Sequence, residues 1–223
     1  GLTEKVIEQY ESMFSGVFYD RFIRGLWVVA EGLVYPMFDE RNITDEVPES
    51  GEYYMSCDYG TLNPFSAGLW CWNGKAATRV REYYYSGRDE RSNKTDEEYY
   101  IKLEKLAGNL PVKSVVIDPS AASFIEVIRR HKRFRVQKAV NDVIPGIATT
   151  ARYIQDGTIK VCRSCKDAIR EFGLYRWDEK STEDKPIKEN DHAMDDIRYF
   201  TMTILRHKVR KAGQQQYIPL WER

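Results

Sequence analysis

The sequence predicts an α/β fold in which a mixed sheet, with antiparallel and parallel strands, is flanked by helices. Two β-rich runs meet at Asn73-Gly74, a pair that favours a tight hairpin turn. Residues 112–118 form an almost unbroken apolar run, which is typical of a strand at the middle of a sheet. Helical patterns then alternate with strand patterns, and this alternation predicts parallel strands.

The early part of the fold is predicted to be three hairpin-connected strands followed by a helix. Thr95 and Glu98 have the spacing of a capping box, which predicts the start of that helix, and Gly108 ends it. The strands are expected at residues 53–59, 66–72 and 77–86.

The later part is predicted to be mostly helical, with one more short strand. A helix is expected to open at Ser120, and residues 174–190 are rich in charge and suggest a long hairpin or loop. The remaining segments are a strand at 134–138 and helices at 144–155, 164–173 and 191–208. This order of elements is that of an RNase H-like fold.

Residues 1–51 are predicted to stand apart from a compact domain that spans residues 52–223. Residues 1–14 have an amphipathic helical pattern, and residues 39–52 are acidic and contain proline and glycine, as linkers do. A chain of 223 residues suits one sizeable domain plus such a peripheral segment.

Charge is unevenly spread along the chain, although the formal net charge is zero. Residues 120–170 hold 11 Lys and Arg against 4 Asp and Glu, whereas residues 36–58 hold 7 acidic residues and one arginine. A basic patch beside an acidic cluster suits a protein that cuts DNA, because cations hold phosphates while carboxylates hold metal ions. Ordinary surface variation would give similar counts.

The cysteine spacing does not predict a metal site. Cys162 and Cys165 form a CxxC pair, but no second close pair supplies the other ligands that zinc needs. All four cysteines are therefore expected to be reduced thiols. No apolar run approaches the roughly 20 residues of a membrane span. No P-loop sequence of the form GxxxxGKS or GxxxxGKT occurs, so no ATP site of that type is expected.

Three aspartates are placed where a charge needs a partner. Asp58 follows the first strand, and Asp118 ends the apolar strand at 112–118. A charge at the end of a buried strand is costly unless it is paired or binds a metal ion. Asp195 shares one face of the final helix with His192. If that helix crosses the sheet near both strand ends, the three carboxylates converge.

Converging carboxylates would suit phosphodiester hydrolysis with two Mg²⁺ or Mn²⁺ ions. Hard cations prefer carboxylate oxygens, and two ions roughly 3.5–4 Å apart stabilise the attacking and leaving oxygens. Asp58 would bridge both ions, while Asp118 and Asp195 would each hold one. His192 would bind a metal ion, shuttle a proton or hydrogen-bond a carboxylate. Singly, each aspartate has a simpler explanation as a turn residue or as an acid at a helix start.

Three sequence blocks resemble the motif blocks of one family of phage enzymes. They are SCDYGTLNPFS around Asp58, VVIDPSAASFI around Asp118, and KENDHAMDDIRYF around His192 and Asp195. With the lead-in RFIRGLWVVAEGLVYPMFD, they resemble the nuclease domain of the terminase large subunit of tailed bacteriophages, closest to those that package by a headful mechanism. The resemblance covers about residues 17–207.

The resemblance implies an RNase H-like endonuclease that cuts concatemeric double-stranded phage DNA when genome packaging starts and ends. It makes Asp58, Asp118 and Asp195 the metal-binding catalytic residues and adds His192. Residues 1–51 would then lead out of an ATPase motor domain. The implied partners are DNA, that motor, the terminase small subunit and the portal protein, in the cytoplasm of the host cell.

Three further residues are candidates for supporting or DNA-binding roles. Asp196 is adjacent to Asp195, and the sequence leaves open which of the two faces the metal ions. Lys188 and Asp191 lie just before His192, and Lys188 carries the charge to contact the scissile phosphate or a catalytic carboxylate.

The sequence leaves two other classes of function open. One is another RNase H-like nuclease, such as a Holliday-junction resolvase, a ribonuclease H or a transposase core. The other is a module that docks DNA or the portal protein without catalysis, and whose acids are structural. Activity confined to RNA–DNA hybrids or four-way junctions would favour the first, and metal-independent binding without cleavage would favour the second.

Overall fold

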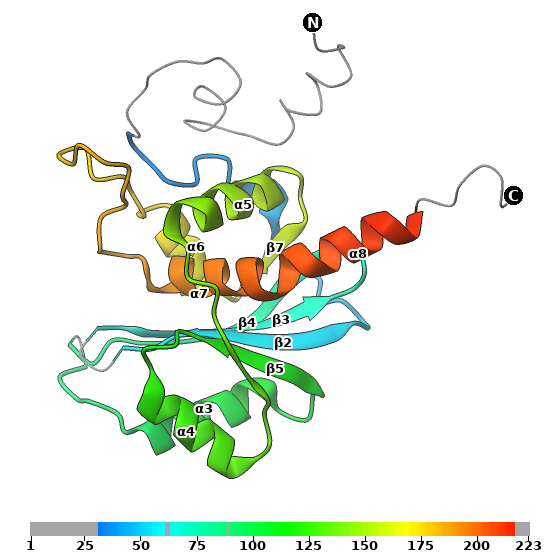
Figure 1. Cartoon of the computed structure of the whole chain (residues 1–223), viewed down its shortest axis with the longest axis vertical. Coiled ribbons are helices and arrows are strands. Elements are labelled where there is room, and N and C mark those ends of the chain that lie inside the picture. The colour runs from blue at the N-terminus through cyan, green and yellow to red at the C-terminus, as the bar shows by residue number, and fades with distance from the viewer. Residues whose placement is uncertain (1–30, 61–62, 89, 217–223) are drawn as a thin grey trace, which may run out of the picture.

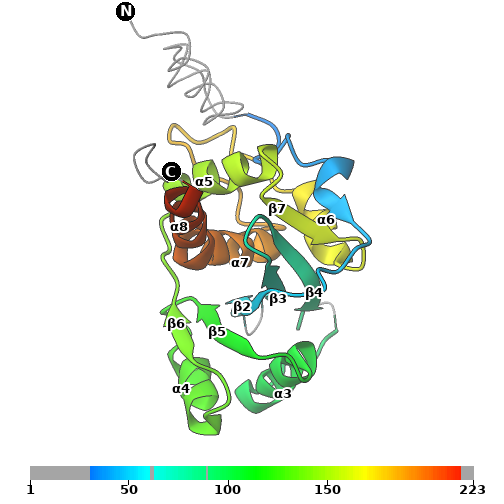
Figure 2. The same cartoon turned by 90° about the vertical axis from the view of Figure 1, so that its right-hand side faces the viewer.

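The fold is a seven-stranded mixed sheet between two layers of helices, with strand order β1-β7-β4-β3-β2-β5-β6. It is seen in a computed structural model that describes residues 31–60, 63–88 and 90–216. Helices α3 and α4 cover one face of the sheet, and α5 to α8 lie over the other (Figure 1). A quarter turn shows the same two layers (Figure 2). The predicted fold class is confirmed.

The elements have the following bounds. The strands are β1 (Ile43–Thr44), β2 (Glu52–Asp58), β3 (Phe65–Trp72), β4 (Ala77–Tyr85), β5 (Val112–Ile117), β6 (Val136–Lys138) and β7 (Ile159–Cys162). The helices are α3 (Asp96–Ala107), α4 (Ala122–His131), α5 (Val143–Gln155), α6 (Lys166–Phe172), α7 (His192–Phe200) and α8 (Arg206–Gln216). A 3-10 helix η1 (Glu40–Asn42) precedes β1, and a π-helical segment η2 (Thr201–Leu205) joins α7 to α8.

The hairpin strands form as the sequence predicts. Strands β2, β3 and β4 pair antiparallel, and β5 lies parallel to β2. At the β3–β4 turn, the Asn73 side chain accepts hydrogen bonds from the backbone N–H groups of Lys75 and Ala76, at 3.0 and 2.8 Å. Gly74 has φ +94°, a backbone conformation that would be strained in a residue with a side chain. The capping box between Thr95 and Glu98 is also present.

The elements differ from the predictions in several places. Helix α4 begins at Ala122 rather than Ser120, because the Ser120 N–H donates to the Asp118 carboxylate instead. Strand β7 was not predicted, since four residues are too few for an alternating pattern. The final helix runs to Gln216, and the π-helical segment interrupts it.

The packed unit begins well before the expected boundary at residues 51 and 52. Val34 and Tyr35 are buried, and β1 pairs in parallel with β7. The Asn42 amide donates to the Ile154 carbonyl at 2.7 Å. The acidic segment that was expected to be a linker therefore supplies η1 and an edge strand. The predicted helix at residues 1–14 lies outside the described residues.

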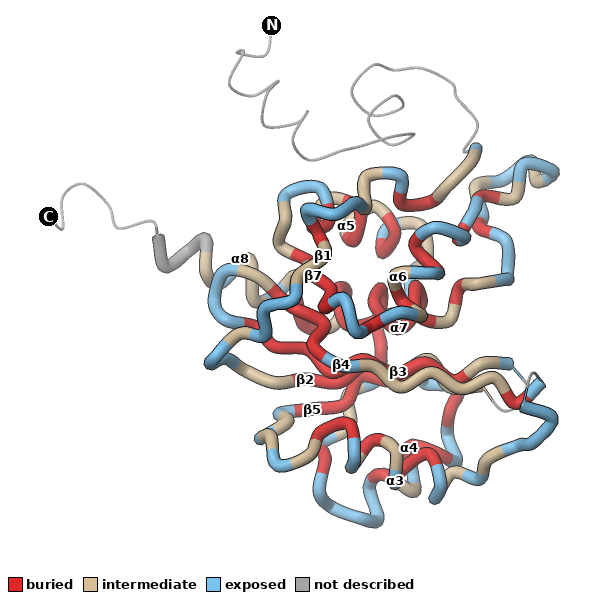
Figure 3. Tube along the Cα trace, turned by 180° about the vertical axis from the view of Figure 1, so that it is seen from behind, coloured by how far each residue is buried: buried red, intermediate tan, exposed pale blue. Residues whose placement is uncertain are grey.

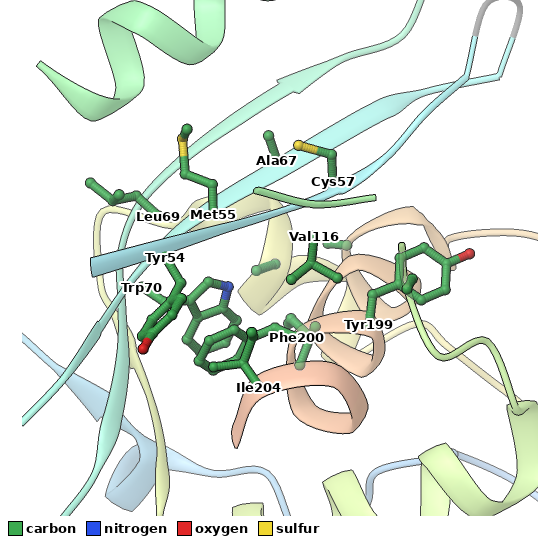
Figure 4. Close-up of a cluster of buried hydrophobic side chains, with 14 of the residues drawn as sticks. Tyr54, Met55, Cys57, Ala67, Leu69, Trp70, Val116, Tyr199, Phe200 and Ile204 are labelled. Atoms are coloured by element: carbon green, nitrogen blue, oxygen red, sulfur yellow. The ribbon is translucent and has the colours of Figure 1, made fainter. Parts of the chain in front are cut away.

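Side chains on the central strands alternate between the two helical layers. In Figure 4, Met55 and Leu69 point to one side of the strands, while Tyr54 and Trp70 point toward α7. Phe200 of α7 stacks on Trp70 with ring centroids 4.3 Å apart. Buried positions run along the central strands and α7 (Figure 3). The sheet and α7 therefore form one core.

One ion pair crosses this core between β4 and α7. Arg79 and Asp196 are both fully buried, and the Arg79 Nη1 lies 2.6 Å from the Asp196 Oδ1. Ser56 and Ser66 donate their hydroxyl groups to the same carboxylate. A Cβ atom at Gly68 would collide with the Arg79 guanidinium, so glycine is needed there. This pair fixes how α7 lies on the sheet.

No helix in the described ranges is long and apolar enough to cross a membrane.

Glu52 ties the start of β2 to two other elements. Lys113 of β5 and Lys208 of α8 both contact its carboxylate, and the Tyr54 hydroxyl donates to it at 2.9 Å. Partial burial would raise the pKa of Glu52, but these contacts outweigh it and lower the pKa to about 2, against an ordinary value of 4.5.

Replacing Glu52 is expected to lower stability in a pH-dependent way. Because the pKa is lower in the folded state, the stabilisation is complete above pH 4.5 and is lost as the pH falls through about 2. Melting temperatures of wild type and Glu52→Gln, measured by circular dichroism, should differ near neutral pH and converge in acid. Glu126→Gln, which removes an exposed pair with Arg130, should melt like wild type throughout. A Glu52→Gln difference that does not vary with pH would contradict the ion-pair explanation.

Candidate active site

The ends of β2 and β5 bring Asp58 and Asp118 to one face of α7. The two strands are parallel neighbours, and their last paired residues lie opposite each other. The Asp58 Oδ2 lies 2.9 Å from the His192 Nδ1. The Tyr199 hydroxyl lies 3.2 Å from the Asp118 Oδ2 and 3.5 Å from the Asp58 Oδ1. Both carboxylates therefore share the hydroxyl of one helix residue.

Asp195 joins the cluster from the same helix, one turn after its start. Its Oδ1 lies 2.9 Å from the Arg198 Nη2, and its Oδ2 lies 3.6 Å from the Lys188 Nζ. Arg198 also donates to Asn141, whose amide donates to Asp118 at 2.6 Å. Sequence reasoning missed Asn141 and Arg198. Asn141 lies in a loop without a pattern, and Arg198 looks like an ordinary helix residue.

The electrostatics of the cluster are those of crowded, poorly solvated acids. Burial is the main cause that raises the pKa of Asp58 to about 6, and the charge of Asp195 adds to it. Burial alone would lower the pKa of His192. The hydrogen bond and charge of Asp58, with Asp191 and Glu171, outweigh burial, so the pKa of His192 is raised. A positive charge close to Asp58 therefore stabilises its ionised carboxylate.

Comparisons with known proteins agree on one kind of protein. A solved structure of the large terminase from a thermophilic bacteriophage, in complex with ADP, is 46% identical to this chain, with a TM-score of 0.87. That match covers 92% of this chain and 52% of the thermophilic phage protein. The curated terminase large subunit of Escherichia phage T5 is 26% identical over 132 residues, which is 56% of this chain and 30% of the T5 protein. No family model matches.

The chain is a relative of the phage large terminases. It spans about half of the thermophilic phage protein and less of the T5 protein. The P22 large terminase nuclease domain has a TM-score of 0.63 at 19% identity, over 81% of this chain and 97% of that domain. The nuclease domain of the SPP1 large terminase, with bound Mn, has a TM-score of 0.52 at 15% identity, over 77% of this chain and 97% of that domain. The chain therefore has the fold of large-terminase nuclease domains.

In this terminase relative, a distant side chain holds the start of α7. Asp191 occupies the N-cap position, but its side chain makes no capping hydrogen bond. Glu171 of α6, which is fully buried, accepts instead from the Ala193 N–H at 2.7 Å. The Tyr84 hydroxyl donates to Glu171 at 2.6 Å. The carboxylate of Glu171 thus connects β4, α6 and α7.

Asp191 and Lys188 support the site rather than form its centre. The Asp191 carboxylate lies 3.7 Å from the His192 Nε2 and 3.6 Å from the Lys188 Nζ. Lys188 contacts Asp191 and Asp195 while its side chain stays 69% exposed. Its ammonium group therefore stands at the rim, where an incoming anion would meet it.

Asp196 lies in the core, where its charge still contributes to the raised pKa of Asp58. It is fully buried and is neutralised by Arg79 in the core. In the structure the Asp196 carboxylate contacts Arg79, Ser56 and Ser66, whereas Asp195 contacts Arg198 and Lys188. Burial leaves no surface of Asp196 for direct contact with DNA, and its supporting role stays a prediction.

The donor chemistry of the cluster suits a hard divalent cation, but the side chains are not arranged around one. Asp58, Asp118 and Asp195 offer carboxylate oxygens, which such cations prefer. Within the described part of the chain, no three His, Cys, Asp or Glu side chains lie close enough to hold a metal ion together. Arg198 holds one oxygen of Asp195. For the three carboxylates to surround a cation, the Asp195 side chain would have to rotate away from Arg198.

The adjacent acids Asp195 and Asp196 are expected to differ sharply in their effect on stability. Asp196→Asn should cost about 3–5 kcal/mol, because it removes the main counter-charge of the buried Arg79 and leaves only Glu82, 3.7 Å from the Arg79 Nε. Asp195→Asn should cost less than half as much, since Arg198 keeps its hydrogen bonds to Asn141 and repulsion on Asp58 falls. Urea unfolding of both variants would measure this. Equal losses would contradict the division of roles.

Proposed function

We propose that this domain is a divalent-metal-dependent endonuclease that cuts double-stranded DNA. In the full-length protein it would cut concatemeric phage DNA when genome packaging starts and ends. The observation that carries the proposal is the meeting of Asp58, Asp118 and Asp195 with His192 at one face of α7. The relatives named as large-terminase nuclease domains support it through their shared fold.

Asp58, Asp118 and Asp195 are the residues that would hold the ions, and we propose two Mg²⁺ or Mn²⁺ ions. The manganese in the SPP1 relative supports a divalent cation of this class. When bound, such ions supply Lewis acidity that stabilises the charge developing on a phosphodiester as it is hydrolysed. The raised pKa of Asp58 favours this use, because a second positive charge relieves a carboxylate that burial destabilises.

His192 has the role of orienting and partly neutralising Asp58. Its Nδ1 donates to the Asp58 Oδ2, which leaves the Oδ1 directed at the Tyr199 hydroxyl. Because acids raise the pKa of His192, the ring is held in its charged form closer to neutral pH than an isolated histidine. The ring therefore fixes one carboxylate oxygen and limits the rotation of the side chain.

Two other cations, Arg198 and Lys188, have supporting roles in the proposed site. Arg198 holds Asp195 and, through Asn141, orients Asp118. Lys188, at the exposed rim, is placed to receive a DNA phosphate. Each acid is thus positioned by a neighbour before substrate arrives, which lowers the cost of ordering the site.

Partners beyond DNA are proposals that rest on the relatives. The whole protein would join this domain to an ATPase motor and would work with a terminase small subunit and a portal protein in the host cytoplasm. The isolated domain is expected to bind DNA weakly, because its formal net charge is zero. The 46% identity to a large terminase disfavours the resolvase, ribonuclease H and transposase alternatives.

Plasmid nicking tests the proposal. With Mn²⁺, the wild type should nick supercoiled DNA and Asp58→Ala should fall to background, because a carboxylate that would hold the ions is lost. His192→Ala should nick roughly 10–100-fold more slowly, as expected when an orienting partner is lost. Glu126→Gln, on the exposed face of α4, is the control and should match wild type. Equal nicking by wild type and Asp58→Ala would remove the case for catalysis here and leave a docking module.

The choice of metal ion separates binding from chemistry. Mg²⁺ or Mn²⁺ should support cleavage, whereas Ca²⁺ should raise the melting temperature without supporting it, because calcium coordinates loosely. Thermal shift assays with each ion measure binding, and the increase should be absent in Asp58→Asn. A calcium-supported nicking rate equal to that with Mn²⁺ would argue against this metal chemistry.

A further inference from the structure

A groove of about 630 Å³ opens directly beside the site, and His192 and Lys188 form part of its wall. The wall continues over Asn190, Arg170 and Tyr84, and Arg88 also lines it. We call this the α6 groove, after the helix that carries Arg170. Two residues of the candidate site border it, so a strand that leaves the site can enter it without a break.

Arg170 is held in the groove at a fixed place relative to the site. Its guanidinium carbon lies 5.4 Å from the centroid of the Tyr84 ring. The Tyr84 hydroxyl is bonded to Glu171, which in turn accepts the Ala193 N–H at the start of α7. The arginine therefore stacks on a ring tied to the residue after His192, yet its side chain is 42% exposed.

The loop that contributes Asn190 to the groove has an uncommon backbone conformation. Asn190 has φ +53°, which is uncommon for a residue with a side chain. The Arg170 Nη1 donates to the Asn190 Oδ1 at 3.2 Å. Strained residues of this kind persist where the surrounding structure determines them, and they cluster at ligand sites. Arg170 thus shapes the loop that presents Lys188 to the site.

The charges in the groove indicate which ligand fits it. The cations Arg88, Arg170 and Lys188 are balanced by the acids Glu90, Asp167 and Glu189. A groove with so little net charge does not attract a free anion from a distance. It suits a chain of spaced phosphates, in which positioned cations meet individual groups and polar side chains contact the sugars.

We propose that the α6 groove receives the backbone of one DNA strand next to the scissile phosphate, and that Arg170 positions one of its phosphates. The proposal rests on the nuclease function proposed above. The Arg170 guanidinium exchanges its contact with Asp167, 3.3 Å away, for a phosphate oxygen and keeps its place over the Tyr84 ring. A fork of this geometry matches phosphate better than a lysine does.

Arg170→Gln tests the proposal against a matched control, Arg152→Gln. Arg152 likewise lies over a tyrosine ring, at 5.9 Å, but it is on α5, is less exposed than Arg170 and does not line the groove. Binding of a fluorescein-labelled duplex is measured by anisotropy in Ca²⁺ over a series of salt concentrations. Arg170→Gln should lower the slope of log affinity against log salt by about one phosphate contact. In Mn²⁺ its KM for DNA should rise about tenfold, while kcat changes much less.

The outcomes separate a phosphate contact from a structural role. Arg170→Lys should recover part of the salt slope. An unchanged slope and KM in Arg170→Gln, or a fall in kcat alone, would overturn the proposal. If Arg170→Gln melts early, Arg88→Gln replaces it, since Arg88 is exposed at another part of the groove. An Arg88→Gln variant with wild-type slope and KM would then overturn the proposal.

The test also distinguishes this proposal from the proposed function. If wild type cuts DNA and Asp58→Ala does not, while Arg170→Gln and Arg152→Gln bind and cut alike, only the groove assignment fails. If wild type never cuts, the nuclease assignment fails, and the groove assignment falls with it.

Discussion

The structure depends on the position of α7, and the buried pair of Arg79 and Asp196 sets that position. Desolvating two charges is expensive, and the cost is offset only where geometry is good and the remaining lone pairs are bonded. Here Ser56 and Ser66 complete the carboxylate, and Gly68 leaves room for the guanidinium. Such a pair tolerates little rotation of the helix. With Asp196 directed into the core, the face of α7 that carries His192, Asp195 and Tyr199 is directed at the strand ends.

Two adjacent acids on α7 therefore have different surroundings: one belongs to the core and the other faces the candidate site. Asp196 is fully neutralised and inaccessible, whereas Asp195 has partners that can be exchanged. The start of the same helix is held by Glu171, whose carboxylate also holds Tyr84. The face of α7 that is proposed to be catalytic thus depends on contacts to the core at one side and to α6 at its first turn. Neither set of contacts uses the carboxylates proposed to hold metal ions.

The sequence predicts the local features of this molecule better than its long-range ones. The capping box at Thr95 and the turn at Asn73 depend on neighbours within four residues, and both appear as expected. The contact that holds the start of α7 could not be predicted from local sequence, because Glu171 lies 22 residues away from Ala193 in the chain. Strand β1 was not predicted, for a related reason. Its two residues pair with β7, and an acidic segment gives no hint of that partner.

The sequence predicts Asp58 and Asp118 from their positions at strand ends and Asp195 from its helix face, but it does not predict the partners of these acids. Asn141 and Arg198 connect Asp118 to Asp195; no sequence pattern marks Asn141, and Arg198 lies in the third motif block without a role that the sequence assigns. These partners change what the cluster can do. Because protein donors already contact each acid, the fold does not need a cation to hold the carboxylates together. Under the proposed function, a cation would compete with Arg198 and Lys188 for Asp195, so its binding would be weaker than three free carboxylates would give. A DNA phosphate that drew Lys188 away would remove one competitor, and the proposal therefore couples occupation of the site by metal to the arrival of substrate.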